Sequence, residues 1–214
     1  MEPLARHQCL IYDGSPARVL PAIAAQIKQK LRENVRCLYL NSPTMVAGIR
    51  SYLYAAGVDV AYEVARTGLV LTSDQHHLKN GHFDAAYMLG MLEDMVNQAL
   101  SDKYEGLWAT GDMTWELGPE RKPEKLVDYE WGLEKLFQKH PTLSGICQYH
   151  ADTLPREAVC RGLLAHPTLF INETLTRINP NYVGSEAPVD LAAPTPELSD
   201  TVNNLCALQL VKEL

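Results

Sequence analysis

The chain has 214 residues, enough to bury one full hydrophobic core with a short appendage. Its hydrophobic share of 46% and charged share of 21% are typical of a globular protein. The formal net charge of -7 argues against a nucleic-acid surface, because contacts to phosphates need clustered lysine and arginine. No stretch approaches the roughly 18 consecutive apolar residues of a membrane span. The polar start MEPLARHQ does not have the pattern of a signal peptide. The five cysteines lack the spacing of a disulfide framework, so we expect reduced thiols. We expect a soluble cytoplasmic protein that contacts neither nucleic acid nor membrane directly.

Strand-like and helix-like segments alternate along the chain. Short apolar runs predict strands at residues 7–12, 35–40, 69–72, 107–110 and 144–149, with a sixth at 168–171. Apolar residues at helical spacing predict helices at residues 16–33, 44–56, 83–100, 124–139 and 155–165. Pro21 lies near the start of the first helix, where it either kinks the first turns or delays the helix.

This alternation predicts an α/β fold: a three-layer sandwich with a mainly parallel, RecA-like sheet and helices on both faces. In that fold we expect the first strand to lie between the fourth and the fifth. Residues 1–184 would form the domain and residues 185–200, with three prolines, a linker or an extended arm. Residues 201–214 would form a C-terminal helix that packs on the core or on a partner.

Residues 106–117, GLWATGDMTWEL, form the most informative stretch of the chain. A buried parallel strand that ends in Asp112 delivers an acid to the sheet edge where ligands bind. In a P-loop NTPase this acid would hold magnesium, and a G-x-x-x-x-G-K-[ST] loop would follow the first strand. Here DGSPARV follows it, with Gly14 as its only glycine and no lysine before residue 28. The sequence thus predicts an NTPase-like scaffold without the phosphate-binding loop, with the Tyr12 ring in the place of the triphosphate.

Two pairs of residues share strand faces. His7 and Cys9 lie two positions apart on the first strand, and Cys147 and Tyr149 do the same on the fifth, with His150 at its exit. One interpretation is a soft-metal site or a reactive thiol beside a histidine. The other is buried apolar cysteines with a hydrogen-bonded histidine, which we favour because H-x-C has no metal-specific spacing. His7 also lies at the start of its strand, whereas Asp112 and His150 lie at the ends of theirs, so a single ion could not bind all three.

Several polar residues are expected at the carboxyl edge of the sheet. The loop after the third strand carries Asp74 and three histidines, which either bind zinc or, as we favour, line a ligand pocket or face solvent: His76, His77 and His82. Asp112 and Trp115 either cap a turn and pack under a loop, or form a polar anchor and an aromatic wall of a pocket. These two interpretations are compatible.

Several dispersed motifs, in order, resemble the MEDS domain, the sensory domain of methanogen and methylotroph regulators that include a dichloromethane-responsive repressor. The matching stretches are HQCLIY, NGHFD, GLWATGDMTWEL, Tyr129-Glu130, CQYH, AHPTLFIN and NPNYV. The resemblance implies a relative of the circadian ATPase and RecA group without the Walker A loop. It also implies a sensor that binds a small organic ligand, such as a hydrocarbon derivative, and signals to an output partner. His150, where the family more often has an acid, and the histidine-rich loop depart from the family pattern.

We therefore expect a non-catalytic sensory domain that needs no cofactor or metal and acts through a regulatory protein partner or as a homodimer. DNA readout would come from a partner. One alternative is a metal- or thiol-dependent enzyme or redox sensor that uses Cys9, Cys147 and nearby histidines. Another is a structural interaction domain whose C-terminal helix makes the contact. The candidate ligand-binding residues are His7, Cys9, Tyr12, Asp74, His77, Asp112, Trp115, Cys147, Tyr149 and His150.

Overall fold

A computed structural model describes residues 6–73, 82–114, 123–184 and 194–210. These residues form a seven-stranded sheet in the order β3-β2-β4-β5-β1-β6-β7, parallel except for β7, which runs antiparallel to β6. The strands are β1 (His7–Tyr12), β2 (Arg36–Asn41), β3 (Leu69–Ser73), β4 (Leu107–Asp112), β5 (Leu143–His150), β6 (Thr168–Asn172) and β7 (Leu175–Ile178).

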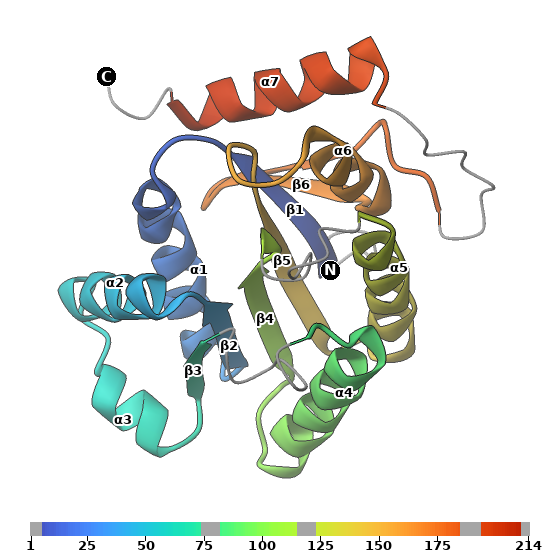
Figure 1. Ribbon diagram of the computed structural model, residues 1–214. Helices are drawn as coiled ribbons and strands as arrows, with labels where there is room; N and C mark the ends of the chain where they lie inside the picture. Colours follow the sequence, from blue (N-terminus) through green and yellow to red (C-terminus); the bar gives the residue numbers. More distant parts are fainter. Residues whose placement is uncertain (1–5, 74–81, 115–122, 185–193, 211–214) are drawn as a thin grey trace.

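Helices cover both faces of the sheet, so the domain has three layers (Figure 1). They are α1 (Leu20–Arg32), α2 (Pro43–Ala55), α3 (Val60–Ala65), α4 (Ala85–Ser101), α5 (Pro123–Lys139), α6 (Arg156–Ala165) and α7 (Pro196–Leu210). A 3-10 helix, η2 (Pro16–Val19), precedes α1, so the α-helix is delayed around Pro21 as the sequence suggested. On one side lie α1 and α2 with α3, and on the other lie α4, α5 and α6, while α7 packs against β1, α6 and β6.

Alternation along the strands divides the core between the two faces. On β1, Cys9 and Ile11 join the core under α4, α5 and α6, whereas Leu10 and Tyr12 join the core under α1 and α2. Successive side chains of a strand point to opposite faces, so the parity of a residue number on a strand decides which helices it meets. Cys147 of β5 belongs to the same face as Cys9, as the sequence predicted.

The α/β fold with a mainly parallel sheet is confirmed. The five predicted strands and the sixth are present, with bounds that shift by no more than a few residues. The predicted position of the first strand was wrong: β1 pairs with β5 and β6, not with β4. Because β4 and β5 pair directly, as consecutive strands commonly do, β1 meets only the far side of β5.

Three differences concern elements that carry a weak hydrophobic pattern. The short helix α3 was not predicted, and neither was β7, whose four residues are all exposed and so show no buried face. The last helix begins at Pro196, inside the segment assigned to a linker, because proline is compatible with the first turn of a helix. Its buried face includes Val202 and Leu205, whereas Leu208 is exposed.

Candidate functional site

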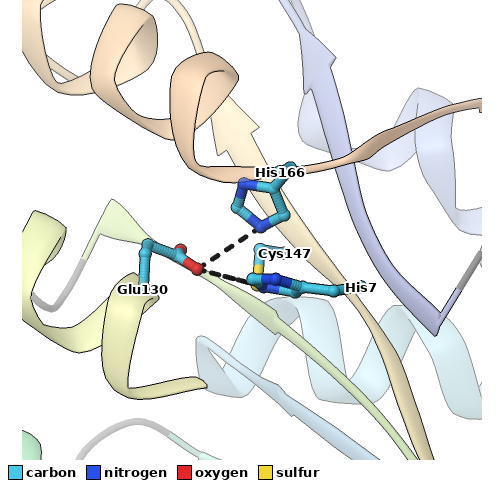
Figure 2. A group of neighbouring side chains, drawn as sticks. All are labelled: His7, Glu130, Cys147 and His166. Carbon is cyan, nitrogen blue, oxygen red and sulfur yellow. Dashed lines mark hydrogen bonds and ion pairs between the residues drawn. The ribbon is translucent and has the colours of Figure 1, made fainter. Parts of the chain in front are cut away.

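A group of buried polar side chains lies between the sheet and the helices α5 and α6 (Figure 2). His7 comes from the start of β1, Cys147 from the middle of β5, Glu130 from α5, and His166 from the turn between α6 and β6. None of the four is more than 5% exposed. One potential ligand atom from each lies within 4.8 Å of the other three. We call these four residues the buried cluster.

Oε2 of Glu130 is the centre of the buried cluster. It lies 3.3 Å from Nε2 of His7 and 3.3 Å from Nε2 of His166, and both imidazoles point toward it in Figure 2. The thiol of Cys147 donates to the same oxygen, with a sulfur–oxygen distance of 3.6 Å, and its sulfur lies 3.8 Å from Nε2 of His7. One carboxylate oxygen therefore faces two imidazoles and a thiol.

The outward atoms of the cluster are held by further hydrogen bonds. Nδ1 of His7 lies 2.8 Å from Oε2 of Glu134, one turn along α5 from Glu130. Nδ1 of His166 donates to the carbonyl oxygen of Gly162 at 2.7 Å. The hydroxyl of Tyr149 donates to Oε1 of Glu130. Groups outside the cluster thus set the orientation of the side chains of His7, His166 and Glu130.

Burial and charge act in opposite directions on the titratable groups here. Burial disfavours the charged imidazole of His7, but hydrogen bonds and charge interactions with Glu130 and Glu134 outweigh it, so the pKa of His7 is raised. Burial and the neighbouring charge of His7 lower the pKa of His166 to about 4. Burial alone would raise the pKa of Glu130, but the two histidines lower it. At neutral pH the carboxyl group of Glu130 is therefore ionised and the imidazole of His166 is neutral.

Nε2 of His166 has no hydrogen-bond partner among the described residues, although it lies 3.3 Å from a carboxylate oxygen. A carbonyl oxygen can only accept, so the contact with Gly162 places the proton of the neutral ring on Nδ1. Nε2 of His166 then carries a lone pair that points at the ionised carboxylate of Glu130. A buried polar atom in that state costs stability unless a third group satisfies it.

Cys9 lies beside this cluster. It is opposite Cys147 in the β1–β5 register and is 1% exposed. Burial, with a contribution from the charge of Glu130, raises the pKa of its thiol well above the ordinary value. All five cysteines lie among the described residues, and they are buried and form no disulfide there. A thiol with these properties is protonated at neutral pH and is a poor nucleophile.

A second polar group lies on the opposite face of the sheet, at its carboxyl edge. The hydroxyl of Tyr12 donates to Oδ2 of Asp112 at 3.4 Å across β5, and the Tyr12 ring stacks on His150 with centroids 4.9 Å apart. Nε2 of His150 lies 2.8 Å from the carbonyl oxygen of Gly14. The backbone amide of Thr114 donates to Asp112, which is the turn-capping role expected from the sequence.

An apolar cavity lies next to the buried cluster, under α4 and α5. Its empty space is about 500 Å³ with the opening to solvent included, but the space that the centre of a water-sized sphere can occupy is only about 40 Å³. Small residues on the sheet, Ala109, Gly111 and Gly145, leave room there that larger side chains would fill. The rest of its lining is mainly aliphatic and aromatic, and Cys147 lines it as well as the cluster. A separate, solvent-open hollow at the carboxyl edge includes Tyr12 but none of the other candidate residues.

The structure thus divides the candidate residues into two groups. His7, Cys9, Cys147 and Tyr149 meet at the buried cluster, and Tyr12, Asp112 and His150 meet at the carboxyl edge on the other face. His7 lies at the opposite end of its strand from the level of Asp112 and His150, as the sequence indicated, and the two groups are also on opposite faces of the sheet. Asp74, His77 and Trp115 lie outside the described residues.

The sequence analysis missed Glu130 and His166 as site residues. Both stand in stretches that carry the family resemblance, Tyr129-Glu130 and AHPTLFIN. Glu130 had a further signal: with Leu126, Leu133 and Phe137 it forms one stripe at helical spacing, and all four are buried. An acid in the apolar stripe of a helix needs a buried partner.

The fold and the cluster define a three-layer α/β domain that encloses a small group of polar side chains and, next to it, an apolar cavity. A family model matches residues 6–167, and the family is MEDS, the MEthanogen/methylotroph, DcmR Sensory domain. The chain therefore belongs to the MEDS family of sensory domains, and all four members of the buried cluster lie inside the match. No curated protein matches the chain. In the part of the chain that the structure describes, no helix has the length and apolar character needed to span a membrane.

Proposed function

We propose that this MEDS domain binds a small, uncharged organic molecule in the apolar cavity, does not transform it chemically, and transmits its presence to a regulatory partner. The observation that carries the proposal is the cavity itself. Ligand sites are lined mainly by apolar side chains, with a few polar groups that fix the orientation of the ligand. The lining of this cavity has that character, with Thr110, Tyr129 and Cys147 as its polar residues, and its space of about 40 Å³ restricts the ligand to a very small molecule.

The lining favours an uncharged ligand over a nucleotide. Around the cavity stand Leu38, Leu40, Met88, Leu92 and Leu133, and no lysine or arginine of the described residues lines it. Burying a phosphate there would leave its charge without a partner, which is strongly unfavourable. A hydrocarbon derivative would instead gain about 25 cal/mol for each Å² of apolar surface removed from water.

Thermal denaturation of the full chain in the presence of candidate ligands tests this proposal. Dichloromethane, benzene and short alcohols should include molecules that raise the melting temperature in a saturable way, because a ligand that binds only the folded state stabilises it. ATP with magnesium serves as the comparison. Stabilisation by magnesium-ATP, with no effect of the organic molecules, would contradict the proposal.

A variant that fills the cavity locates the binding. Ala109→Leu places three additional carbons in the cavity and should abolish the ligand-dependent shift. Ala47→Leu makes the same chemical change on the exposed surface of α2 and should leave the shift intact. A shift that persists in Ala109→Leu would place the ligand elsewhere, for example in the solvent-open hollow beside Tyr12.

The helix α7 is our proposed route to the partner. It packs against β1, the strand that carries His7, and its residue Gln209 donates to the carbonyl oxygen of Ile171 in β6. Hydrogen exchange in α7, measured with and without ligand, should change if this helix transmits the signal. The mass of the full chain in solution, measured in both states, separates a homodimer from a complex with another protein.

A further inference from the structure

Four of the six separations between the ligand atoms of the buried cluster match the edges of a small tetrahedron. They are 3.3 Å for each of the two nitrogen–oxygen pairs, 3.6 Å for oxygen–sulfur and 3.8 Å for one nitrogen–sulfur pair, and the other two are within 4.8 Å. A tetrahedral zinc ion with bonds of about 2.0–2.1 Å to nitrogen and oxygen and about 2.3 Å to sulfur needs edges of about 3.3 Å and about 3.5–3.6 Å. The four measured distances in the cluster are already close to the edges that a zinc ion needs.

We propose that Nε2 of His7, Oε2 of Glu130, Sγ of Cys147 and Nε2 of His166 bind one divalent metal ion of the zinc class. The inference is independent of the proposed ligand site, since it rests on the cluster and not on the cavity. From the sequence, buried apolar cysteines were favoured over a soft-metal site at His7 and Cys147, because H-x-C has no metal-specific spacing.

The hydrogen bonds around the cluster are those that orient metal ligands. A histidine that binds a metal through one nitrogen commonly donates its other N–H to a carboxylate or a backbone carbonyl. His7 has Glu134 in that position, and His166 has the carbonyl oxygen of Gly162. Tyr149 occupies Oε1 of Glu130 and leaves Oε2 directed at the two imidazoles.

The lone pair of His166 separates this arrangement from a buried ion pair. In an ion pair each imidazole nitrogen would donate a proton to the carboxylate. Nε2 of His166 makes no hydrogen bond in the described part of the chain, and its ring carries the proton on the opposite nitrogen. A metal ion between Nε2 and Oε2 would satisfy both atoms at once.

The donor set selects the kind of metal. Two imidazoles, one carboxylate and one thiolate are typical ligands of zinc and its neighbours, whereas calcium and magnesium prefer oxygen atoms alone. The charges also balance: the carboxylate and the thiolate neutralise a divalent ion, and the imidazoles are neutral when they bind. Formation of the metal–sulfur bond breaks the S–H bond of Cys147, and this proton leaves to solvent together with any proton on Nε2 of His7. Four protein ligands close the site, which favours a structural or sensing role.

Metal analysis of the full chain, purified without an affinity tag, tests the proposal. After zinc is added and unbound metal is dialysed away, the wild-type protein should hold one zinc per chain. Cys147→Ser and His166→Gln should each lose most of it. Cys9→Ser, in the opposite register position, should retain it. Zinc content that is absent from the wild type, or undiminished in both cluster variants, overturns the proposal.

A competing site is the histidine-rich loop, so a His76→Gln/His77→Gln double variant is the second control and should bind zinc normally. If the cluster variants fail to fold, cobalt in the wild-type protein decides. Tetrahedral Co²⁺ bound to a thiolate shows intense visible bands and a sulfur-to-metal charge-transfer band in the near ultraviolet. A weak six-coordinate spectrum without that band overturns the proposal, and the organic-ligand screen is unaffected by either result.

Discussion

The phenol of Tyr149 donates a hydrogen bond to Oε1 of Glu130, and water reaches neither side chain. This contact joins β5 to α5 through two polar groups inside an otherwise apolar layer. It leaves the second oxygen of the carboxylate directed at His7 and His166. The position of Glu130, and with it the geometry of the buried cluster, therefore depends on Tyr149.

Tyr149→Phe should lower the free energy of unfolding of the metal-free protein by about 1–3 kcal/mol, because a buried carboxylate oxygen loses its donor. Urea denaturation measures the change. Tyr54→Phe, which removes a hydroxyl from a side chain that is 79% exposed, should have an effect within about 0.5 kcal/mol. Equal effects of the two substitutions would show that the buried contact adds nothing to stability.

Gly162→Ala should displace the Tyr149 ring. A Cβ atom at residue 162 would lie 2.3 Å from two ring carbons, far inside van der Waals contact. We expect a loss of about 1–3 kcal/mol in the free energy of unfolding, the usual cost of overpacking.

Gly90→Ala is the matched control for that experiment. Gly90 also lies in a helix, α4, and apart from its chain neighbours and its own helix backbone no described atom stands within 4 Å of its added Cβ. Alanine should stabilise this helix by about 0.5–1 kcal/mol, because glycine loses more chain entropy on folding. Changes of the same sign at both positions would mean that the contact with Tyr149 is not the cause.

Asp112→Asn should alter how stability depends on pH. Burial raises the pKa of Asp112 from its ordinary value, despite the opposing hydrogen bond from Thr114. An acid with a higher pKa in the folded protein stabilises the fold below its ordinary pKa and loses that contribution as the pH rises through the folded pKa. Wild type should therefore lose stability relative to Asp112→Asn across that window.

Urea denaturation of both proteins, at intervals from about pH 4 to about pH 7, measures this difference. The titratable side chains that contact Asp112 or act on it are Tyr12, His150 and Tyr39. Asparagine keeps an oxygen that can accept from the Thr114 amide. Parallel stability curves for the two proteins would contradict the prediction.

Leu205→Ala should weaken the attachment of α7 to the core. Leu205 is 8% exposed, and loss of a buried leucine side chain costs about 2–5 kcal/mol, with the lower end expected at an outer helix. Leu208→Ala removes the same atoms from an exposed position of the same helix and should cost no more than about 0.5 kcal/mol. Hydrogen exchange in α7 distinguishes detachment of this helix from unfolding of the whole domain.

Hydrophobic alternation predicted the strands and the faces that their residues share. His7 and Cys9, and Cys147 and Tyr149, were paired correctly, because a period of two needs no knowledge of neighbouring strands. The same parity along β5 separates Cys147 from His150 and would have divided the candidates into two groups.

The cluster itself depends on distant segments that only the folded chain brings together. His166 stands in a turn, where no periodicity marks it, and Glu130 lies in a helix whose charged residues are mostly at the surface. The position of β1 beside β5 and β6 was not encoded in any local pattern, since pairing order is set by how the crossover helices pack.

One six-residue strand carries a member of each polar group: His7 at one end of β1 contacts the buried cluster, and Tyr12 at the other contacts Asp112 on the opposite face. This strand pairs with β5 over its whole length and with β6 at Gln8 and Cys9, so neighbouring strands hold it on both sides. We therefore expect a shift of His7 along the strand axis to displace the Tyr12 ring as well, and to alter the contact between β1 and the helix α7. Through β1 the sheet connects the two core layers that cover its opposite faces.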